Sequence, residues 1–266
     1  MMGIVRELNE AARAQRIRRR VSELVRSLMS YKSLHKLDLP DLEKVKEVER
    51  LQSEIIEDLR GRIDVERCDA RCVILKSGEL LGREKLDGYC RRAQSLLGLE
   101  PSGCSPEDLA GLAETTSIDP DKTGGLLLVV QGLLRGLSEE LKRQGYSWSG
   151  ISHRCPVCGL ESETMVRKGD GYYMVCHMCF FTWLVSRGIP VCPRCGSTVP
   201  LEVGIFTDKS RRIGLGFCSR CGYSWRILLD QYMSVPDHAA PLIALGAERF
   251  RPAMEKALEK GLEEWG

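Results

Sequence analysis

Several features that would place a chain in a common functional class are missing here. The longest apolar run, Leu126–Val130, is far shorter than the roughly 20 residues of a membrane-spanning helix. The first residues carry charges every few positions and lack the apolar core of a secretory signal. We therefore expect a cytoplasmic protein without a membrane span.

An excess of charge of one sign is missing as well. Lys and Arg number 39 against 37 Asp and Glu, and the formal net charge is +2. Proteins that bind nucleic acid usually carry a basic surface, so we do not expect nucleic acid as a partner. The sequence also lacks a Ser-His-Asp set, a glycine-rich phosphate loop and a paired-carboxylate motif, and we predict that the chain is not an enzyme.

The first part of the chain has the pattern of a helical domain. Apolar residues recur with a period of 3.6, and glycines and prolines mark the ends of the repeats. The pattern predicts helices over residues 4–29, 40–61, 86–98 and 124–144, with a short one after the N-cap signature at 105–108. The helix at 124–144 is the most apolar, and we expect it to lie at the centre of a bundle. Residues 62–82 fit no single pattern.

A cluster of arginines lies off the apolar stripe of the first predicted helix: Arg16, Arg18, Arg19 and Arg20. Such a cluster could form a nucleic-acid patch, but glutamates flank it on both sides. We interpret it as a solvated helix face without a binding function.

The composition changes after Tyr146–Gly150, where cysteine, glycine, proline and aromatic residues become frequent. Beyond this point the chain contains an internal repeat. Each copy reads C-P-x-C-G, a spacer, then C-x-x-C-x-aromatic-hydroxyl-Trp; the copies run from Cys155 to Trp183 and from Cys192 to Trp225. Each copy therefore supplies four cysteines on two C-x-x-C turns, which we call knuckles.

This spacing is typical of metal sites, because a tight turn aims two sulfurs at one ion while backbone N–H groups face the thiolates. The repeat pairs the knuckles within each copy. The first cysteine set is Cys155, Cys158, Cys176 and Cys179. The second cysteine set is Cys192, Cys195, Cys218 and Cys221. Pairing across the copies would need a more entangled chain path. We predict two metal ions, with zinc as the default and iron as the alternative that uses the same ligands.

The cysteines also allow interpretations other than metal ligation. C-x-x-C also occurs in redox dithiol proteins, but four such pairs without a βαβ pattern favour metal ligation. The remaining cysteines, Cys68, Cys72, Cys90 and Cys104, are interpreted as small buried apolar residues, with a Cys68–Cys72 or Cys90–Cys104 disulfide as the alternative.

Residues beside the knuckles carry further expectations. Three knuckles end in glycine, which tolerates positive φ, whereas Cys179 is followed by Phe180, so we expect that knuckle to be distorted. Trp183 and Trp225 occupy equivalent positions and are expected to pack over the sites. His153 and His177 are expected to be exposed to solvent.

Together these patterns predict an α+β fold. It comprises an N-terminal all-α helical domain, two tandem rubredoxin-like or zinc-ribbon modules and a C-terminal helix. The predicted boundaries are residues 1–149, 150–188, 189–230 and 231–266. The last helix carries its apolar side chains at Phe250, Met254, Leu258 and Leu262 and follows a loop with Pro236 and Pro241.

The order of these motifs resembles the formate dehydrogenase accessory protein (FdhE) family. The likeness covers about residues 150–230 and rests on a Trp148 hinge, C-P-V-C-G, Tyr173–Cys176, Trp183, Arg187, C-P-R-C-G, Phe217–Cys218 and Arg226–Leu228. The chain departs from the family at Phe180 and at Asp237-His238, where an acidic pair is usual.

The resemblance implies a cytoplasmic maturation factor, or chaperone, that carries metal on the eight knuckle cysteines and binds a formate dehydrogenase catalytic subunit. A zinc-ribbon protein that binds nucleic acid is one alternative, although only Lys209, Arg211 and Arg212 cluster. A rubredoxin-like electron-transfer protein with iron is another. The oligomeric state stays open, a homo-oligomer included.

Overall fold

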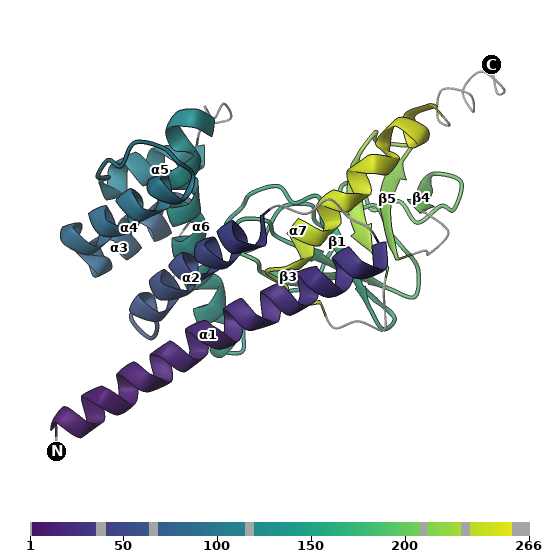
Figure 1. The fold of residues 1–266 in the computed structure, drawn as a ribbon. Coiled ribbons are helices and arrows are strands. Elements are labelled where there is room, and N and C mark those ends of the chain that lie inside the picture. Colours follow the sequence, from purple (N-terminus) through teal and green to yellow (C-terminus); the bar gives the residue numbers. More distant parts are fainter. Residues whose placement is uncertain are drawn as a thin grey trace. The chain divides into compact units, whose positions relative to one another are not determined.

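The computed structural model describes residues 2–35, 41–63, 69–114, 120–207, 212–229 and 235–256 (Figure 1). The chain divides into two compact units. The helical unit comprises residues 1–29, 40–146 and 157–159, and the cysteine-rich unit comprises residues 30–39, 147–156 and 160–266. None of the helices in the described ranges is both long enough and apolar enough to cross a membrane.

Among the described residues, six helices precede the cysteine repeat. They are α1 (Met2–His35), α2 (Leu42–Leu59), α3 (Ala70–Leu81), α4 (Arg83–Leu96), α5 (Pro106–Glu114) and α6 (Pro120–Arg143). Ser105 caps α5 as its sequence predicts, since the Asp108 N–H donates to Ser105 Oγ at 3.1 Å. Residues 62–82, for which the sequence predicts no single element, contain α3. Its first turn is capped by the Asp69 carboxylate. Pro40, the predicted start of α2, lies outside the described residues.

The α6 helix is the centre of the helical unit, because it packs against α2, α3, α4 and α5. Its glycines allow this close packing. A Cβ at Gly125 would lie 2.7 Å from the Gln94 Cα, and one at Gly132 would lie 2.8 Å from Ile55 Cδ1. The apolar face of α6 predicted its burial, but the contacts of these glycines depend on the neighbouring helices.

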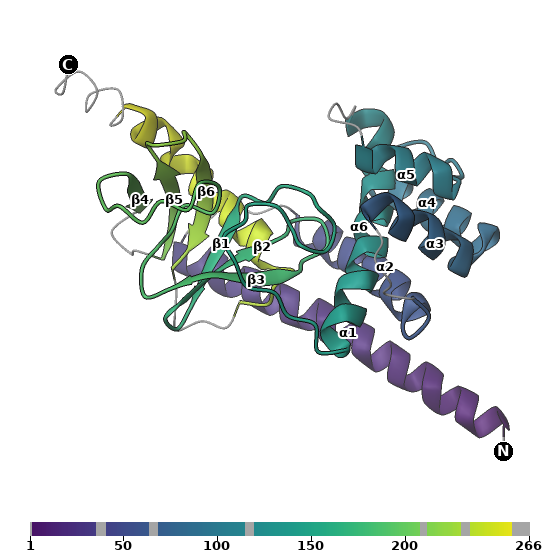
Figure 2. The ribbon, with the colours of Figure 1, turned by 180° about the vertical axis from the view of Figure 1, so that it is seen from behind.

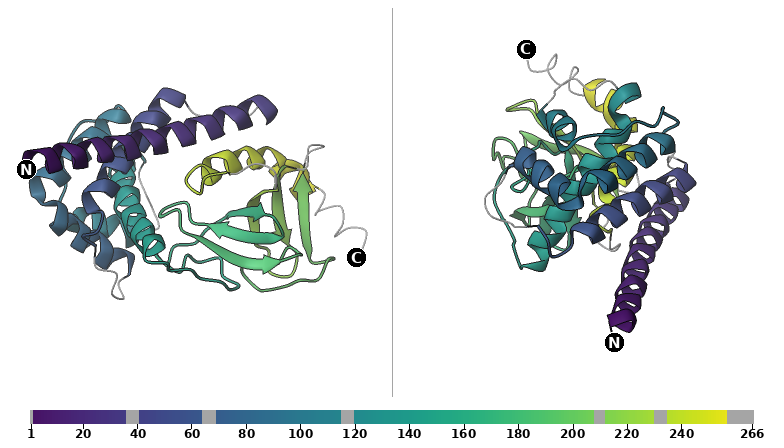
Figure 3. Two further views of the ribbon diagram at one scale, coloured as in Figure 1. Left: turned by 90° about the horizontal axis from the view of Figure 1, so that it is seen from below. Right: turned by 90° about the vertical axis from the view of Figure 1, so that its left-hand side faces the viewer.

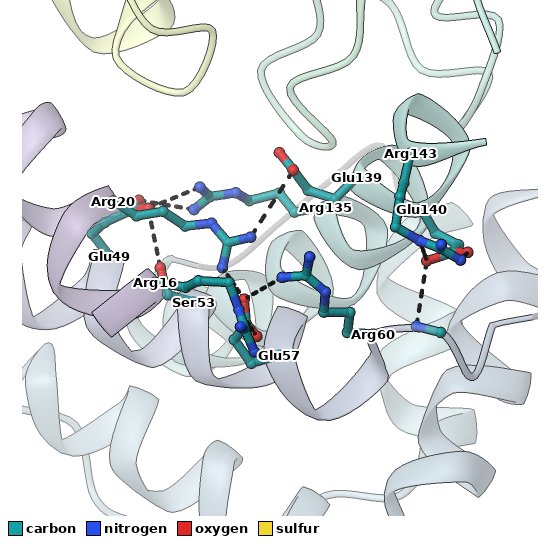
Figure 4. A network of polar contacts seen from close by, with 11 residues as sticks. Arg16, Arg20, Glu49, Ser53, Glu57, Arg60, Arg135, Glu139, Glu140 and Arg143 are labelled. Carbon is teal, nitrogen blue, oxygen red and sulfur yellow. Dashed lines mark hydrogen bonds and ion pairs between the residues drawn. The ribbon is translucent and has the colours of Figure 1, made fainter. Parts of the chain in front are cut away.

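A polar network crosses the same helices (Figure 4). Arg135 of α6 is 3% exposed and binds both carboxylate oxygens of Glu49 on α2, at 2.8 and 2.9 Å. On α1, Arg16 and Arg20 contact the buried Glu57 carboxylate at 2.7 and 2.9 Å. A buried carboxylate is costly without a partner, so this pairing stabilises the packing of α1 on α2.

The arginine cluster of α1 is therefore only partly a solvated face. Arg19 has that role, with a side chain 79% exposed. The interpretation was wrong for Arg20, whose side chain is 18% exposed in its ion pair with Glu57, while Arg16 binds the same carboxylate from a side chain 39% exposed. The α1 sequence alone gives no sign of a buried acid on another helix.

The favoured interpretation of the extra cysteines was also wrong. Cys90 on α4 and Cys104, just before α5, form a disulfide across 14 residues of sequence. Both are buried, as expected, but not as free thiols. Cys72 is disulfide-bonded too, and Cys68 lies outside the described residues. The helical unit thus contains disulfides, whereas the eight knuckle cysteines form none.

Six strands form the sheet of the cysteine-rich unit (Figure 2). They are β1 (Thr164–Lys168), β2 (Gly171–Val175), β3 (Thr182–Arg187), β4 (Val203–Thr207), β5 (Ile213–Cys218) and β6 (Ser224–Leu228). Their order in the sheet is β3-β2-β1-β6-β5-β4. All neighbours pair antiparallel except β1 and β6, which pair parallel with Met165 opposite Ile227.

Each copy of the repeat contributes three consecutive strands to this sheet. The parallel β1–β6 pair joins the two copies, so the two predicted modules share one sheet and one core. The Tyr223 hydroxyl strengthens the joint by donating to the Ser162 carbonyl at 2.5 Å. The helices and the mixed sheet agree with the α+β prediction, whereas the module boundaries stay a prediction.

The C-terminal segment covers one face of the sheet (Figure 3). It consists of α7 (Ala240–Ala244), the 3-10 helix η1 (Leu245–Phe250) and helical residues 251–256. The helix begins earlier than expected, with Pro241 in its first turn, where the missing N–H costs no hydrogen bond. Met254 is buried as predicted, and Leu258 and Leu262 lie outside the described residues.

Candidate metal centres

The four knuckles have one backbone conformation. In each, the N–H of the first cysteine donates to the carbonyl five residues later, at distances of 2.8 to 3.0 Å. Phe180, Gly196 and Gly222, each directly after the second cysteine of its knuckle, also donate back to the carbonyl of the first cysteine. Local hydrogen bonds therefore fix the direction of each cysteine pair, as the C-x-x-C spacing predicts.

Phe180 is the exception in sequence but not in structure. It adopts φ of 52°, in the region that glycine occupies in the other knuckles, and its N–H still donates to the Cys176 carbonyl at 3.0 Å. The expected distortion of this knuckle was wrong. Phe180 is buried, and the burial of its ring offsets the roughly 1–2 kcal/mol that a left-handed conformation costs an L-residue.

The knuckles gather into two groups of four. In each cysteine set, all four sulfur atoms lie within 4.8 Å of one another. Cys155 Sγ lies 3.4 Å from Cys179 Sγ, and two sulfur pairs of the second cysteine set are 3.6 Å apart. Tetrahedral zinc with Zn–S bonds of about 2.3 Å would hold its sulfurs about 3.8 Å apart, so the geometry of the donors fits such an ion.

The electrostatics of the donors also call for a cation. Burial raises the pKa of the Cys192 thiol to about 12, and burial likewise raises the pKa of the Cys218 thiol. By contrast, a backbone hydrogen bond from Ser197 lowers the pKa of Cys195 to about 7. In this partly buried set, a cation would compensate the charge of four thiolates and so favour the deprotonated form of all four cysteines.

The two cysteine sets differ in their exposure to solvent. All four cysteines of the first set are buried. In the second set Cys192 and Cys218 are buried, Cys221 is half-buried and Cys195 is exposed. The repeated sequence gives the two sets the same ligands and does not predict this difference.

The aromatic residues around the knuckles are part of the core. Trp183 and Trp225 are each 1% exposed, and the Trp183 indole donates to the Ser152 carbonyl at 3.0 Å. They are not exposed recognition aromatics. His177 is exposed as expected, whereas His153 is half-buried and packs edge-on against Tyr223 with ring centres 5.5 Å apart.

Tyr223 is the residue whose role the sequence reasoning missed. Its ring is buried, it stacks on Trp225, and its hydroxyl binds the other copy of the repeat. The repeat contained a signal, because Tyr223 occupies the position of Phe181 but adds a hydroxyl. A buried hydroxyl requires a partner, and Ser162 supplies it.

Comparison with known proteins gives a likeness of fold. Neither a protein-family model nor a curated protein matches the chain. Among solved structures, the chain is similar to the FdhE protein from Pseudomonas aeruginosa, with a TM-score of 0.51 and 14% sequence identity. The match covers 90% of this chain and 92% of that one. The resemblance that the knuckles indicated is thus confirmed as an FdhE-like fold with two four-cysteine sets.

Proposed function

We propose that this chain is a metal-binding accessory protein that binds the catalytic subunit of a formate dehydrogenase in the cytoplasm and assists its assembly. The observation that carries the proposal is the presence of two four-cysteine sets within an FdhE-like fold. The order of the knuckle motifs, which resembles that family, supports the same function. The protein would act by binding rather than by catalysis.

Each cysteine set would hold one ion, and zinc suits four thiolates in a closed tetrahedron. Zinc would supply positive charge and rigid cross-linking without redox chemistry, whereas iron on the same sulfurs would add a one-electron couple. Elemental analysis of protein purified from its own host decides between them. We expect two zinc ions per chain and no visible absorbance.

The partner is tested with the two natural proteins. The tagged full-length chain is mixed with the purified catalytic subunit of the host's formate dehydrogenase, and binding is measured by pull-down and calorimetry. We expect a saturable complex, together with lower formate dehydrogenase activity in cells that lack this chain.

A variant with Arg19→Met serves as a control, since that exposed side chain makes only a surface ion pair with Glu23. It should bind and support maturation like the natural chain. Full formate dehydrogenase activity without this chain, combined with no detectable complex, would refute the proposed function.

A further inference from the structure

The two cysteine sets have the same ligands in different surroundings. In the first set, Cys155, Cys158, Cys176 and Cys179 are 2, 4, 0 and 1% exposed. In the second set, only Cys192 and Cys218 are covered to that degree, and Cys195 is exposed. An incoming donor atom can therefore approach one candidate ion from solvent but not the other.

The residue after the last knuckle is one sequence difference between the two copies, whereas Cys158 and Cys195 are both followed by glycine. Cys179 is followed by Phe180 and Phe181, which are 9% and 1% exposed and belong to the core beside the first set. Cys221 is followed instead by Gly222, which has no side chain to cover a sulfur. Tyr223, at the position of Phe181, is buried as well, so the apolar cover after the last knuckle differs between the copies at one position, Phe180 against Gly222.

Backbone hydrogen bonds hold the turn that follows the exposed Cys195. The Glu202 and Val203 N–H groups both donate to the Val199 carbonyl at 2.9 Å, and the Ser219 N–H donates to the Glu202 carbonyl at 2.8 Å. Leu201, at the tip of this turn, is 91% exposed. Because backbone hydrogen bonds fix the turn, the exposure of Cys195 is built into the fold.

Access controls the rate at which a thiolate site exchanges its metal. Zinc leaves such a site when an outside donor binds the ion as one cysteine sulfur detaches, and both events need solvent contact. An ion held by four buried sulfurs can exchange only after the chain around it opens locally. The free energy of this opening adds to the activation barrier for exchange.

We propose that the second cysteine set is an exchange site, which releases and recaptures its ion through Cys195 by reaction with small thiol or nitrogen donors, while the first set holds its ion permanently. This inference rests on the metal binding in the proposed function but not on the dehydrogenase partner. In the exchange the donor's bond to zinc forms as the zinc bond to Cys195 Sγ breaks, and no electrons are transferred.

The test uses the full-length chain with two bound zinc ions, mixed with an excess of a chromogenic zinc chelator. We expect release in two phases of equal amplitude, one ion each. The fast phase should exceed the slow one by on the order of tenfold or more, and tenfold is about 1.4 kcal/mol of activation free energy.

Alkylation assigns the phases to the cysteine sets. Iodoacetamide is added when the fast phase ends, and modified peptides are identified by mass spectrometry. We expect label on the second set and protection of the first. The matched variants Cys195→Ser and Cys158→Ser change the equivalent ligand in each copy, and only Cys195→Ser should remove the fast phase. If Cys158→Ser does not fold, the alkylation pattern of the natural chain gives the assignment.

Three results would overturn the proposal. They are one common rate for both ions, label on the first set before the second, and a chain that binds fewer than two zinc ions. The last result would also contradict the metal binding of the proposed function. The first two would leave that function intact, because the rate at which an ion exchanges does not decide whether the dehydrogenase subunit binds.

Discussion

The helical unit and the cysteine-rich unit reach stable folds by different means. The helical unit buries long apolar helices, with Leu51, Ile55 and Leu133 fully enclosed, and carries a buried ion pair between α2 and α6. The cysteine-rich unit has strands of only five or six residues, and knuckles form its β2–β3 and β5–β6 turns. From this contrast we expect the first fold to depend on side-chain packing between distant segments, and the second to depend in addition on its candidate ions.

The sharpest test of this comparison is metal removal. Exhaustive chelation should unfold the cysteine-rich unit, because a structural zinc ion contributes an apparent binding free energy on the order of 10–16 kcal/mol. Amide hydrogen exchange of the full-length chain should show loss of protection in β1 to β6 and unchanged protection in α2 and α6. Added zinc should restore the strands. If the strands of metal-free protein kept their full protection from hydrogen exchange, the contrast between the two units would be wrong.

The next largest effect should come from the buried ion pair of the helical unit. Arg135→Met leaves Glu49 buried without its cation and should lower the free energy of unfolding of this unit by about 3–5 kcal/mol. Urea denaturation of the zinc-bound chain measures it. The double variant Glu49→Leu with Arg135→Met should recover most of the loss.

Arg19→Met is the control for that experiment, since its partner Glu23 is also on the surface and exposed pairs contribute about 0–1 kcal/mol. If Arg19→Met and Arg135→Met lowered the free energy of unfolding equally, burial would not determine how much these ion pairs stabilise the fold.

A smaller effect is expected where α6 meets α4. Gly125→Ala places a methyl group 2.7 Å from the Gln94 Cα, and overpacking of this kind costs about 1–3 kcal/mol. Gly88→Ala is the matched control, because Gly88 is at an exposed position of α4 and a Cβ there would meet nothing within 4 Å. That change should stabilise the helix by about 0.5–1 kcal/mol. The midpoint temperature of thermal denaturation should therefore fall for Gly125→Ala and rise for Gly88→Ala.

The smallest effect concerns a knuckle. Gly222 has φ of 70° and open space around it, so Gly222→Ala adds only backbone strain. A cost of about 1–2 kcal/mol would weaken zinc binding at the second cysteine set by a factor of roughly 5–30. Competition with a chelator of known affinity measures the change, and the first set should keep its affinity. An unchanged second set would mean that the knuckle does not need positive φ.

Prediction from the sequence succeeded where the determinants are local. The C-x-x-C spacing and its backbone hydrogen bonds lie within six residues, and the repeat showed which knuckles gather. The periods of α2, α4 and α6 likewise follow from neighbouring residues. Prediction failed at Arg20 and Cys90, whose partners are supplied by another helix and by a later turn.

The sequence by itself determined the helices other than α3, the four knuckles and the donor atoms of two candidate ions, because each depends on residues close together in the chain. Only the tertiary structure decided that β1 and β6 join the two copies into one sheet, that the buried Glu57 pairs with two arginines of α1, and that Cys195 stays exposed. The physical reason is that burial and pairing belong to the neighbours a side chain acquires on folding. Two identical ligand sets can therefore occupy unlike environments.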